Sequence, residues 1–229
     1  MSVTRKKNVL NFNYQINGYM LERVDQYKYL GLTFTSDLRW NTHIENVISK
    51  AFKTLWYLRR TMHSATPDVK CLAYKTLVRP IIEYAKVVWD PHTATNIHKL
   101  DRIQRLAARF IYNKYRRNHS STDLCQQAQL PMLESRTRYE RLKTLYLIIN
   151  NYLKINKSDY FEIKTNETSR HRHSRFIPLP AIKNNCFKFS YFPRTCKDWN
   201  SLPDSAVRSS SLSEFVRHLE NFTYGTTTG

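Results

Sequence analysis

The chain has 229 residues, 24% of them charged and 41% hydrophobic, so it can bury one substantial core or two small ones and lacks the composition of a disordered protein. Its 37 Lys and Arg outnumber its 18 Asp and Glu, which gives a net charge of +19. Because this excess is spread over several segments, the expected partner is a polyanion, with nucleic acid first, although other basic proteins share the composition.

No segment looks like a signal peptide, and no run reaches the roughly 18 apolar residues that would cross a bilayer. The four cysteines are scattered without a C-x-x-C pair and are expected to be reduced thiols. We therefore expect an intracellular protein of the nucleus or cytoplasm that is neither secreted nor bound to a membrane.

The first 40 residues carry strand signals. Residues 9–19 alternate loosely and contain the turn dipeptide Asn17-Gly18, which predicts a hairpin. Residues 27–35 are rich in aromatic and β-branched side chains, with Gly31 inside the run. A glycine inside a strand indicates either a bulge or a close approach of the backbone to something else.

A helical period begins at Asn41. The spacing of Thr42 and Glu45 fits a capping box. Steps of four and three residues separate the apolar side chains that would face a neighbouring helix, namely Ile44, Ile48, Ala51, Leu55, Leu58 and Met62.

Thr66, Pro67 and Asp68 mark the start of a second helix. Its expected inward side chains are Val69, Leu72, Ala73, Thr76 and Leu77. Pro80 should interrupt this helix, and a short helix over residues 81–89 should end at Asp90-Pro91.

A third helix is expected from Thr95 to about residue 117. Its apolar side is formed by Ile97, Leu100, Ile103, Ala107, Phe110 and Ile111. Within about 60° on the opposite side lie Arg102, Arg105, Arg109 and Arg116. This basic face is either a nucleic-acid contact or simply solvated.

Aromatic residues in these helices could stack on bases. We expect most of them to pack in the core instead, namely Trp56, Tyr57, Tyr74, Tyr84 and Trp89. Tyr112 is the best candidate for stacking because it lies on the basic side of its helix.

After a polar segment with a short helix, Pro131 opens a long helix with Tyr139, Leu142, Tyr146, Ile149 and Leu153 on its inner side. A basic connector precedes an aromatic-rich C-terminal unit, whose last helix begins at Ser211. The expected fold is mainly α: a β-hairpin region (1–40), a helical bundle (41–155), a basic connector (156–186) and a small C-terminal α/irregular unit (187–229).

Five tracts carry a resemblance that spans nearly the whole chain. They are residues 27–32 (YKYLGL), 77–85 (LVRPIIEYA), 88–91 (VWDP), 100–110 (LDRIQRLAARF) and 192–203 (FPRTCKDWNSLP). In this order they resemble the C-terminal part of the reverse transcriptase of jockey-like non-LTR (LINE-type) retrotransposons. The resemblance implies that the residues before about Trp40 complete the polymerase palm, and that the later helices form the thumb and C-terminal region.

The resemblance also implies site roles. The hairpin at Tyr29, Leu30 and Gly31 would be the primer grip, which holds the primer backbone near its 3′ end. The nucleic-acid contacts along the template and primer would come from Arg102, Arg105, Arg109, Tyr112 and Arg116. The expected partners are an RNA template, a DNA primer and the missing palm and fingers of the polymerase.

Nucleotidyl transfer by this class needs two metal ions held by carboxylates. The chain has no Asp-Asp pair, and Asp25 and Asp37 beside the hairpin are isolated. We therefore expect no catalytic residue, no metal ligand and no cofactor in this chain, with Mg²⁺ bound only in the intact polymerase.

Other chemistries are weaker. A zinc site from His171, His173, Cys186 and Cys196 lacks the close ligand pairs that zinc favours. The chain has no G-x-S-x-G motif and no Gly-rich phosphate loop. The leading hypothesis is an inactive fragment of an RNA-directed DNA polymerase that binds template and primer; the alternatives are a self-standing basic helical nucleic-acid-binding protein and a protein that binds an acidic partner.

Overall fold

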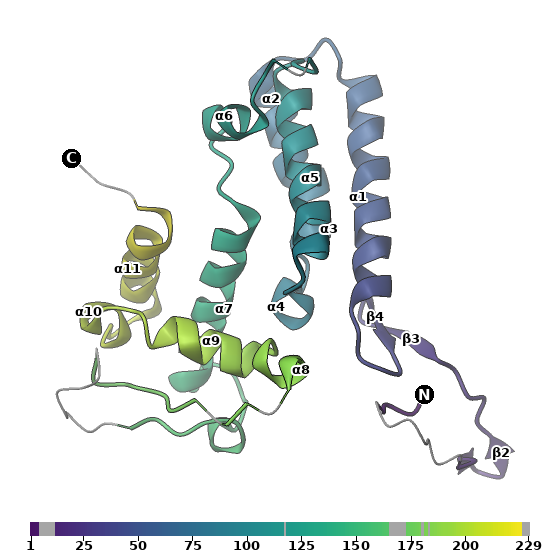
Figure 1. Cartoon of the computed structure of the whole chain (residues 1–229), viewed down its shortest axis with the longest axis vertical. Helices are drawn as coiled ribbons and strands as arrows, with labels where there is room; N and C mark the ends of the chain where they lie inside the picture. Colours follow the sequence, from purple (N-terminus) through teal and green to yellow (C-terminus); the bar gives the residue numbers. More distant parts are fainter. Residues whose placement is uncertain (5–11, 117, 165–172, 180, 183, 226–229) are drawn as a thin grey trace. The chain divides into compact units, whose positions relative to one another are not determined.

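The computed structural model describes residues 1–4, 12–116, 118–164, 173–179, 181–182 and 184–225 (Figure 1). The basic residues 5–7, residues 170–172 of the connector and the last four residues, expected to fray, lie outside these ranges. The described chain is mainly helical with two short hairpins near its start, which confirms the expected fold class. It divides into two units: the first comprises Met1–Tyr84 and Thr93–Leu124, and the second Ala85–His92 and Cys125–Gly229.

Both hairpins turn through two residues. Strands β1 (Gln15–Ile16) and β2 (Tyr19–Met20) meet at Asn17-Gly18, as predicted. Strands β3 (Gln26–Tyr29) and β4 (Leu32–Thr35) pair in unbroken register. Between them Leu30 and Gly31 have φ of 46° and 82°. Positive φ at both central residues matches the twist of the strands, so Gly31 belongs to a tight turn and, of the two alternatives predicted for it, the bulge is wrong.

The first unit is built on helices that pack side by side. They are α1 (Asn41–Thr61), α2 (Pro67–Ala73), the π-helix η1 (Tyr74–Val78), α3 (Arg79–Glu83) and α5 (Ala94–Ile111). Helices α1 and α5 run in the same direction (Figure 1). The Asn96 amide donates to Asn41 Oδ1 at 2.9 Å, and Lys99 pairs with Glu45 at 3.5 Å one turn further on.

The start of α1 differs from expectation. Trp40 stands at the N-cap position and no side chain caps the helix, so the predicted capping box was wrong. The buried stripe holds Ile44, Val47, Ala51, Leu55 and Leu58, while the expected Ile48 and Met62 are only half-buried. His43 is also buried on this helix, and it anchors the adjacent hairpin.

The inward face of the second helix was misplaced by about one residue. Val69, Leu72, Thr76 and Leu77 are exposed, and Ala73 alone of the predicted set is buried. The buried stripe is instead Lys70, Ala73, Tyr74, Val78 and Ile82. The Arg79 amide bonds the Tyr74 carbonyl across the π turn, directly before Pro80, which has no amide to donate. A lysine at the start of the stripe concealed this register in the sequence.

The chain bends again beyond Pro80. Helix α3 ends at Glu83, and Ala85 takes a left-handed conformation with φ of 49° before α4 (Lys86–Trp89) begins. The expected short helix over residues 81–89 is therefore two helices, and the boundary between the units falls between Tyr84 and Ala85.

The second unit is organised around α7 (Leu133–Ile149). The elements that accompany it are α4, the 3-10 helix η2 (Lys157–Asp159), α8 (Asn185–Lys188), α9 (Tyr191–Trp199), α10 (Asp204–Val207) and α11 (Leu212–Tyr224). Helix α6 (Ser121–Gln127) contains the boundary between the units. As predicted, Ser211 caps α11, with its hydroxyl accepting from the Glu214 amide at 3.2 Å.

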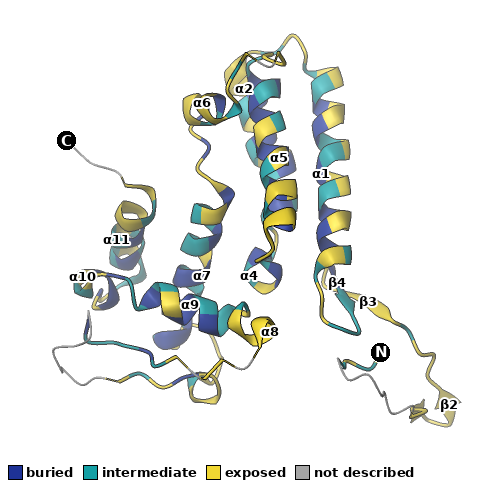
Figure 2. Ribbon diagram, viewed as in Figure 1, coloured by how far each residue is buried: buried dark blue, intermediate teal, exposed yellow. Residues whose placement is uncertain are grey.

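One core joins α7 to the C-terminal helices, and it appears as dark blue segments in Figure 2. Its largest side chains are Tyr146, Trp199 and Phe215, with the rings of Tyr146 and Phe215 stacked at 4.2 Å. Because α7 shares this core, the two units cut the chain differently from the expected division at residues 155 and 187.

Beside this core, three arginines and two aspartates form an ion cluster. Arg141, whose side chain is 4% exposed, pairs with Asp90 and, at 2.7 Å, with Asp198. Arg194 pairs with Asp90 at 2.7 Å, and Arg138 lies 3.3 Å from Asp198. These residues come from α7 and from two of the tracts that carry the resemblance. In this unit, residues of the tracts 88–91 and 192–203 therefore help to stabilise the fold.

Replacement of Arg141 tests this cluster. We expect Arg141→Met to lower the free energy of unfolding by about 3 kcal/mol, since removal of one partner leaves buried carboxylates short of a cation while Arg194 and Arg138 compensate in part. Urea unfolding followed by circular dichroism measures the loss. Lys197→Met, at an exposed cation on α9, should stay within about 0.5 kcal/mol of the parent. Equal effects of the two changes would contradict a stabilising cluster.

Candidate nucleic-acid interface

The positive charge is concentrated in the first unit. This unit holds 20 Lys and Arg against 8 Asp and Glu, whereas the second holds 17 against 10. Arg39, Arg79 and Lys99 are among the cations paired within the first unit. Most of the other cations cannot pair with a carboxylate of this unit because it has too few, so the unit carries unbalanced positive charge.

The predicted primer-grip residues form the tip of the second hairpin. Tyr29 and Leu30 are 58% and 70% exposed. Gly31 has a neighbour on one side, because a Cβ added there would lie 3.3 Å from Cε1 of Tyr84. The Tyr84 hydroxyl also donates to the Leu30 carbonyl at 3.0 Å. The close backbone approach expected at Gly31 is thus made by a ring of the chain itself, and it fixes the tip.

Tyr84 itself was expected in the core, and that prediction was wrong. It is 57% exposed, because its ring leans on the hairpin turn instead of entering the helical core. Tyr74 and Trp89, which were also expected in the core, are fully buried.

Strand β4 of the same hairpin is anchored to α1 through His43. The Thr33 amide donates to Nδ1 of His43 at 3.3 Å, and the Trp40 ring contacts the rings of Phe34 and His43 edge-on, with ring centres 5.2 and 6.0 Å away. Burial lowers the pKa of His43. The bond requires an unprotonated Nδ1, so the attachment of the hairpin depends on a neutral imidazole.

Of the four arginines predicted to share one helical face, two do so. Arg102 and Arg105 are exposed on α5, with the Arg102 guanidinium 5.8 Å from the Phe52 ring centre. Helix α5 ends at Ile111, because Asn113 takes a left-handed conformation with φ of 54°. Arg116 is therefore exposed in the following loop, and the prediction that the helix reaches residue 117 was wrong.

Arg109 has a different place from the one expected. It is half-buried, and its guanidinium donates to three carbonyl oxygens of the loop after α5: those of Lys114 at 3.2 Å, Arg116 at 3.0 Å and His119 at 3.0 Å. Five donors in a planar fork suit such a multiple contact. Arg109 therefore holds this loop instead of pointing freely into solvent.

A buried lysine fastens the start of the same loop. Lys70 is 1% exposed, and its ammonium donates to the His63 carbonyl at 2.9 Å and to Asn113 Oδ1 at 3.0 Å. Burial lowers the pKa of Lys70. Next to Asn113, Tyr112 is half-buried, and burial raises the pKa of its hydroxyl. Tyr112 is thus less open than the stacking role predicted for it requires.

Sequence reasoning missed a group of exposed aromatic side chains. Trp56 and Tyr57 were expected in the core but are 42% and 58% exposed, since the buried stripe of α1 passes through its neighbours at 55 and 58. The guanidinium of Arg59 lies 5.0 Å from the Trp56 ring centre and 4.0 Å from that of Tyr115, which is 41% exposed. The spacing of Trp56 and Arg59 on one helix could have been noticed, but no local signal points to Tyr115.

Two aspartates lie beside the second hairpin, Asp25 and Asp37. The carboxylate of Asp37 accepts from the Thr35 hydroxyl at 2.7 Å and from the Arg39 amide at 3.0 Å, which lowers its pKa. Asp25 is exposed. Across the ranges that the structure describes, no three His, Cys, Asp or Glu side chains gather in a way that could hold a metal ion.

The residues weighed for zinc are dispersed. His171 lies outside the described residues, and Cys186 is exposed. His173 is buried and its Nε2 donates to the Trp199 carbonyl at 3.1 Å. Burial raises the pKa of the Cys196 thiol to about 12. His173 and Cys196 therefore serve the core of the second unit.

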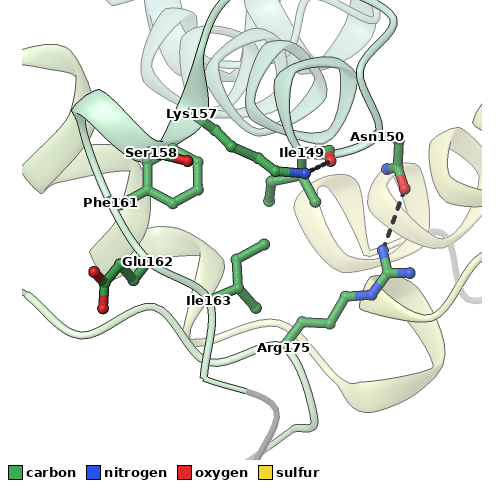
Figure 3. Close-up of a pocket in the computed structure, with 8 residues that line it drawn as sticks. All are labelled: Ile149, Asn150, Lys157, Ser158, Phe161, Glu162, Ile163 and Arg175. Atoms are coloured by element: carbon green, nitrogen blue, oxygen red, sulfur yellow. Dashed lines mark hydrogen bonds between the residues drawn. The ribbon is translucent and has the colours of Figure 1, made fainter.

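The second unit also has a pocket of about 550 Å³ at the C-terminal end of α7 (Figure 3). Lys157 donates to the Ile149 carbonyl at 2.9 Å, and Arg175 donates to Asn150 Oδ1 at 3.3 Å. Cations are favourable at the C-terminus of a helix because its last carbonyls carry partial negative charge. The positions of Lys157 and Arg175 are therefore explained by their contacts with the C-terminal end of α7, without a ligand.

Comparisons with family models, with curated proteins and with solved structures gave no match. Within the described residues, no helix combines the length and the apolar character needed to cross a membrane.

Acidic pH should weaken the attachment of the hairpin. The unfolded chain takes a proton on His43 near the ordinary pKa of 6.5, but the folded chain does so only at lower pH, so the stabilising contribution is complete above 6.5 and is lost as pH falls below it. Urea unfolding at pH 7.5 and pH 5 measures this loss.

The matched variants for this experiment are His43→Asn, which keeps an acceptor but does not titrate, and His98→Asn, at an exposed histidine on α5. We expect the first to reduce the pH dependence and the second to leave it unchanged. The same pH dependence in all three proteins would exclude His43 as its source.

Proposed function

We propose that this chain is the template- and primer-binding part of an RNA-directed DNA polymerase of the non-LTR retrotransposon type, inactive without a palm that supplies metal-binding carboxylates. The observation that carries the proposal is the first unit, which joins 20 cations and 8 acids to an exposed hairpin tip. The order of the five resembling tracts supports the same interpretation.

The contacts proposed are to the nucleic-acid backbone. Arg102 and Arg105 are exposed on one helix, where they can neutralise phosphates and release counterions without reading sequence. The hairpin tip presents Leu30 on a turn that Tyr84 holds by a hydrogen bond. A tip fixed before binding loses little conformational freedom when it contacts the primer.

A self-standing basic nucleic-acid-binding protein is the second candidate. Each unit has buried side chains of its own, such as Tyr74 and Ile82 in the first and Trp199 and Phe215 in the second. This observation favours helices that fold without a palm. Strand β3, by contrast, is exposed at all four residues, as expected of a strand that another strand should cover. A soluble monomer that melts cooperatively favours the second candidate, and insolubility rescued by a co-expressed palm favours the first.

Binding to a primed RNA–DNA duplex should depend steeply on salt. We expect the double variant Arg102→Ala/Arg105→Ala to bind more weakly and to lower the slope of log K against log salt by about 2, close to one per lost phosphate contact. Fluorescence anisotropy at several salt concentrations measures both quantities.

The matched control removes the same charge from the second unit, in Lys197→Ala/Arg217→Ala, where both side chains are exposed. Its slope should equal that of the parent. Equal slopes for both double variants would exclude a specific role of α5. If the parent chain bound an acidic protein as tightly as the primed duplex, the alternative of a protein that binds an acidic partner would be favoured.

The purified chain should not extend a primer. With a primed RNA template, deoxynucleotides and Mg²⁺, we expect no product above background, because the proposal assigns the metal-binding carboxylates to the missing palm. A processive reverse transcriptase assayed in parallel is the positive control. Extension by the chain would refute the inactive interpretation.

A further inference from the structure

Trp56, Arg59 and Tyr115 form a cluster that we call the aromatic cluster. Trp56 and Arg59 lie one turn apart near the end of α1, and Tyr115 comes from the loop after α5. The guanidinium of Arg59 lies against both rings, at 5.0 and 4.0 Å from their centres. Both rings nevertheless remain about two-fifths exposed, so each keeps part of its surface open to a ligand.

The position of Tyr115 is fixed by contacts outside the aromatic cluster. Arg109 bonds the carbonyls on both sides of it, those of Lys114 and Arg116. Two residues before it, Asn113 is held by the buried Lys70. A ring that is held in place before a ligand arrives loses little conformational freedom on binding. The fixed position of Tyr115 therefore suits a binding site.

The guanidinium of Arg59 is able to bind an anion. In the part of the chain that the structure describes, no carboxylate lies within ion-pair distance of its guanidinium. Its N–H groups stay available in the plane of the fork while its faces rest on the rings. An arginine in this state can bind a phosphate without giving up the contacts that orient it.

The surroundings of the aromatic cluster favour nucleic acid over an apolar protein partner. Arg60 follows Arg59 in the sequence, and Lys114 and Arg116 flank Tyr115, all three exposed. Open aromatic faces beside phosphate-binding cations are the combination that binds single strands, since every base has a face that stacks. In a duplex the bases already stack on each other, so exposed rings select unpaired nucleotides.

The aromatic cluster is also separate from the hairpin tip. Along α1 the hairpin joins near Asn41 and the cluster lies near Arg59, a separation of about 27 Å at 1.5 Å per residue. This is the length of about eight base pairs. The hairpin tip and the aromatic cluster would therefore contact different parts of a bound nucleic acid.

We infer that the aromatic cluster binds one unpaired nucleotide of a single strand, with the base against Tyr115 or Trp56 and the phosphate on Arg59. The inference rests on the proposed function and adds to it a preference for a single-stranded segment. Stacking is tolerant of base identity, so no sequence specificity is expected.

Tryptophan fluorescence tests the inference directly. Trp89 and Trp199 are fully buried and Trp40 is half-buried, so Trp56 is the tryptophan best placed to report stacking. We expect a 12-nucleotide oligothymidylate to quench the emission, and an abasic oligonucleotide of the same length to bind five- to a hundredfold more weakly without quenching. Trp56→Leu should abolish the quenching.

Variants separate stacking from folding. Tyr115→Leu should lower the affinity for oligothymidylate five- to a hundredfold and leave that for the abasic strand unchanged, whereas Tyr115→Phe should restore binding. Tyr57→Leu, at an exposed ring one residue from Trp56, is the matched control and should have no effect. Equal melting temperatures show that each variant folds.

Two failures can be told apart. Equal affinity for the two oligonucleotides, without quenching by either, overturns the inference and leaves backbone binding intact. Absence of binding to both oligonucleotides and to primed duplex at low salt overturns the proposed function as well.

Discussion

The chain folds with an excess of 19 positive charges, so each cation that it buries needs an acceptor from its own sequence. The two units meet this demand differently. In the first, Lys70 and Arg109 bond carbonyl oxygens and an amide, which use up no acids. In the second, Arg141 takes two carboxylates, from Asp90 and Asp198. The first unit has only 8 acids, and although some of them pair with cations such as Arg39, Arg79 and Lys99, they are too few to balance its 20 cations.

Hydrogen bonds between residues far apart in the sequence fix the chain at both ends of α1. At one end Thr33 bonds His43 and Tyr84 bonds Leu30, so the hairpin is attached through strand β4 and at its tip. At the other end, Lys70 and Arg109 hold the loop that carries Tyr115. The groups proposed to contact nucleic acid therefore project from short loops tied to rigid helices, and such sites keep their geometry better than free loops.

Local patterns in the sequence predicted the local elements. Periodicity located α1, α5 and α7, and the Asn17-Gly18 dipeptide located a hairpin turn, because these signals lie within one element. Some errors were local, such as the capping box of α1 and the register of the second helix, but others concern contacts between distant residues. Tyr84 and Leu30 are 54 positions apart, and Lys70 and Asn113 are 43 apart. Arg102 and Arg105 could be foreseen from the face of one helix, whereas the pairing of Tyr115 with Arg59 could not, since it depends on where α5 ends.

The resembling tracts mix residues that the fold requires with residues that it does not. Trp89, Asp90 and Arg194 are explained by a buried core and an ion cluster, which would serve any protein with these helices. Leu30 and Arg105, which also lie in such tracts, are exposed, and burial gives no reason for their identity. An exposed leucine at a turn and an exposed arginine on a helix each cost the fold little to replace. If these tracts reflect more than a shared architecture, exposed members such as Leu30 and Arg105 carry that information, and these two lie on the unit with the larger excess of positive charge.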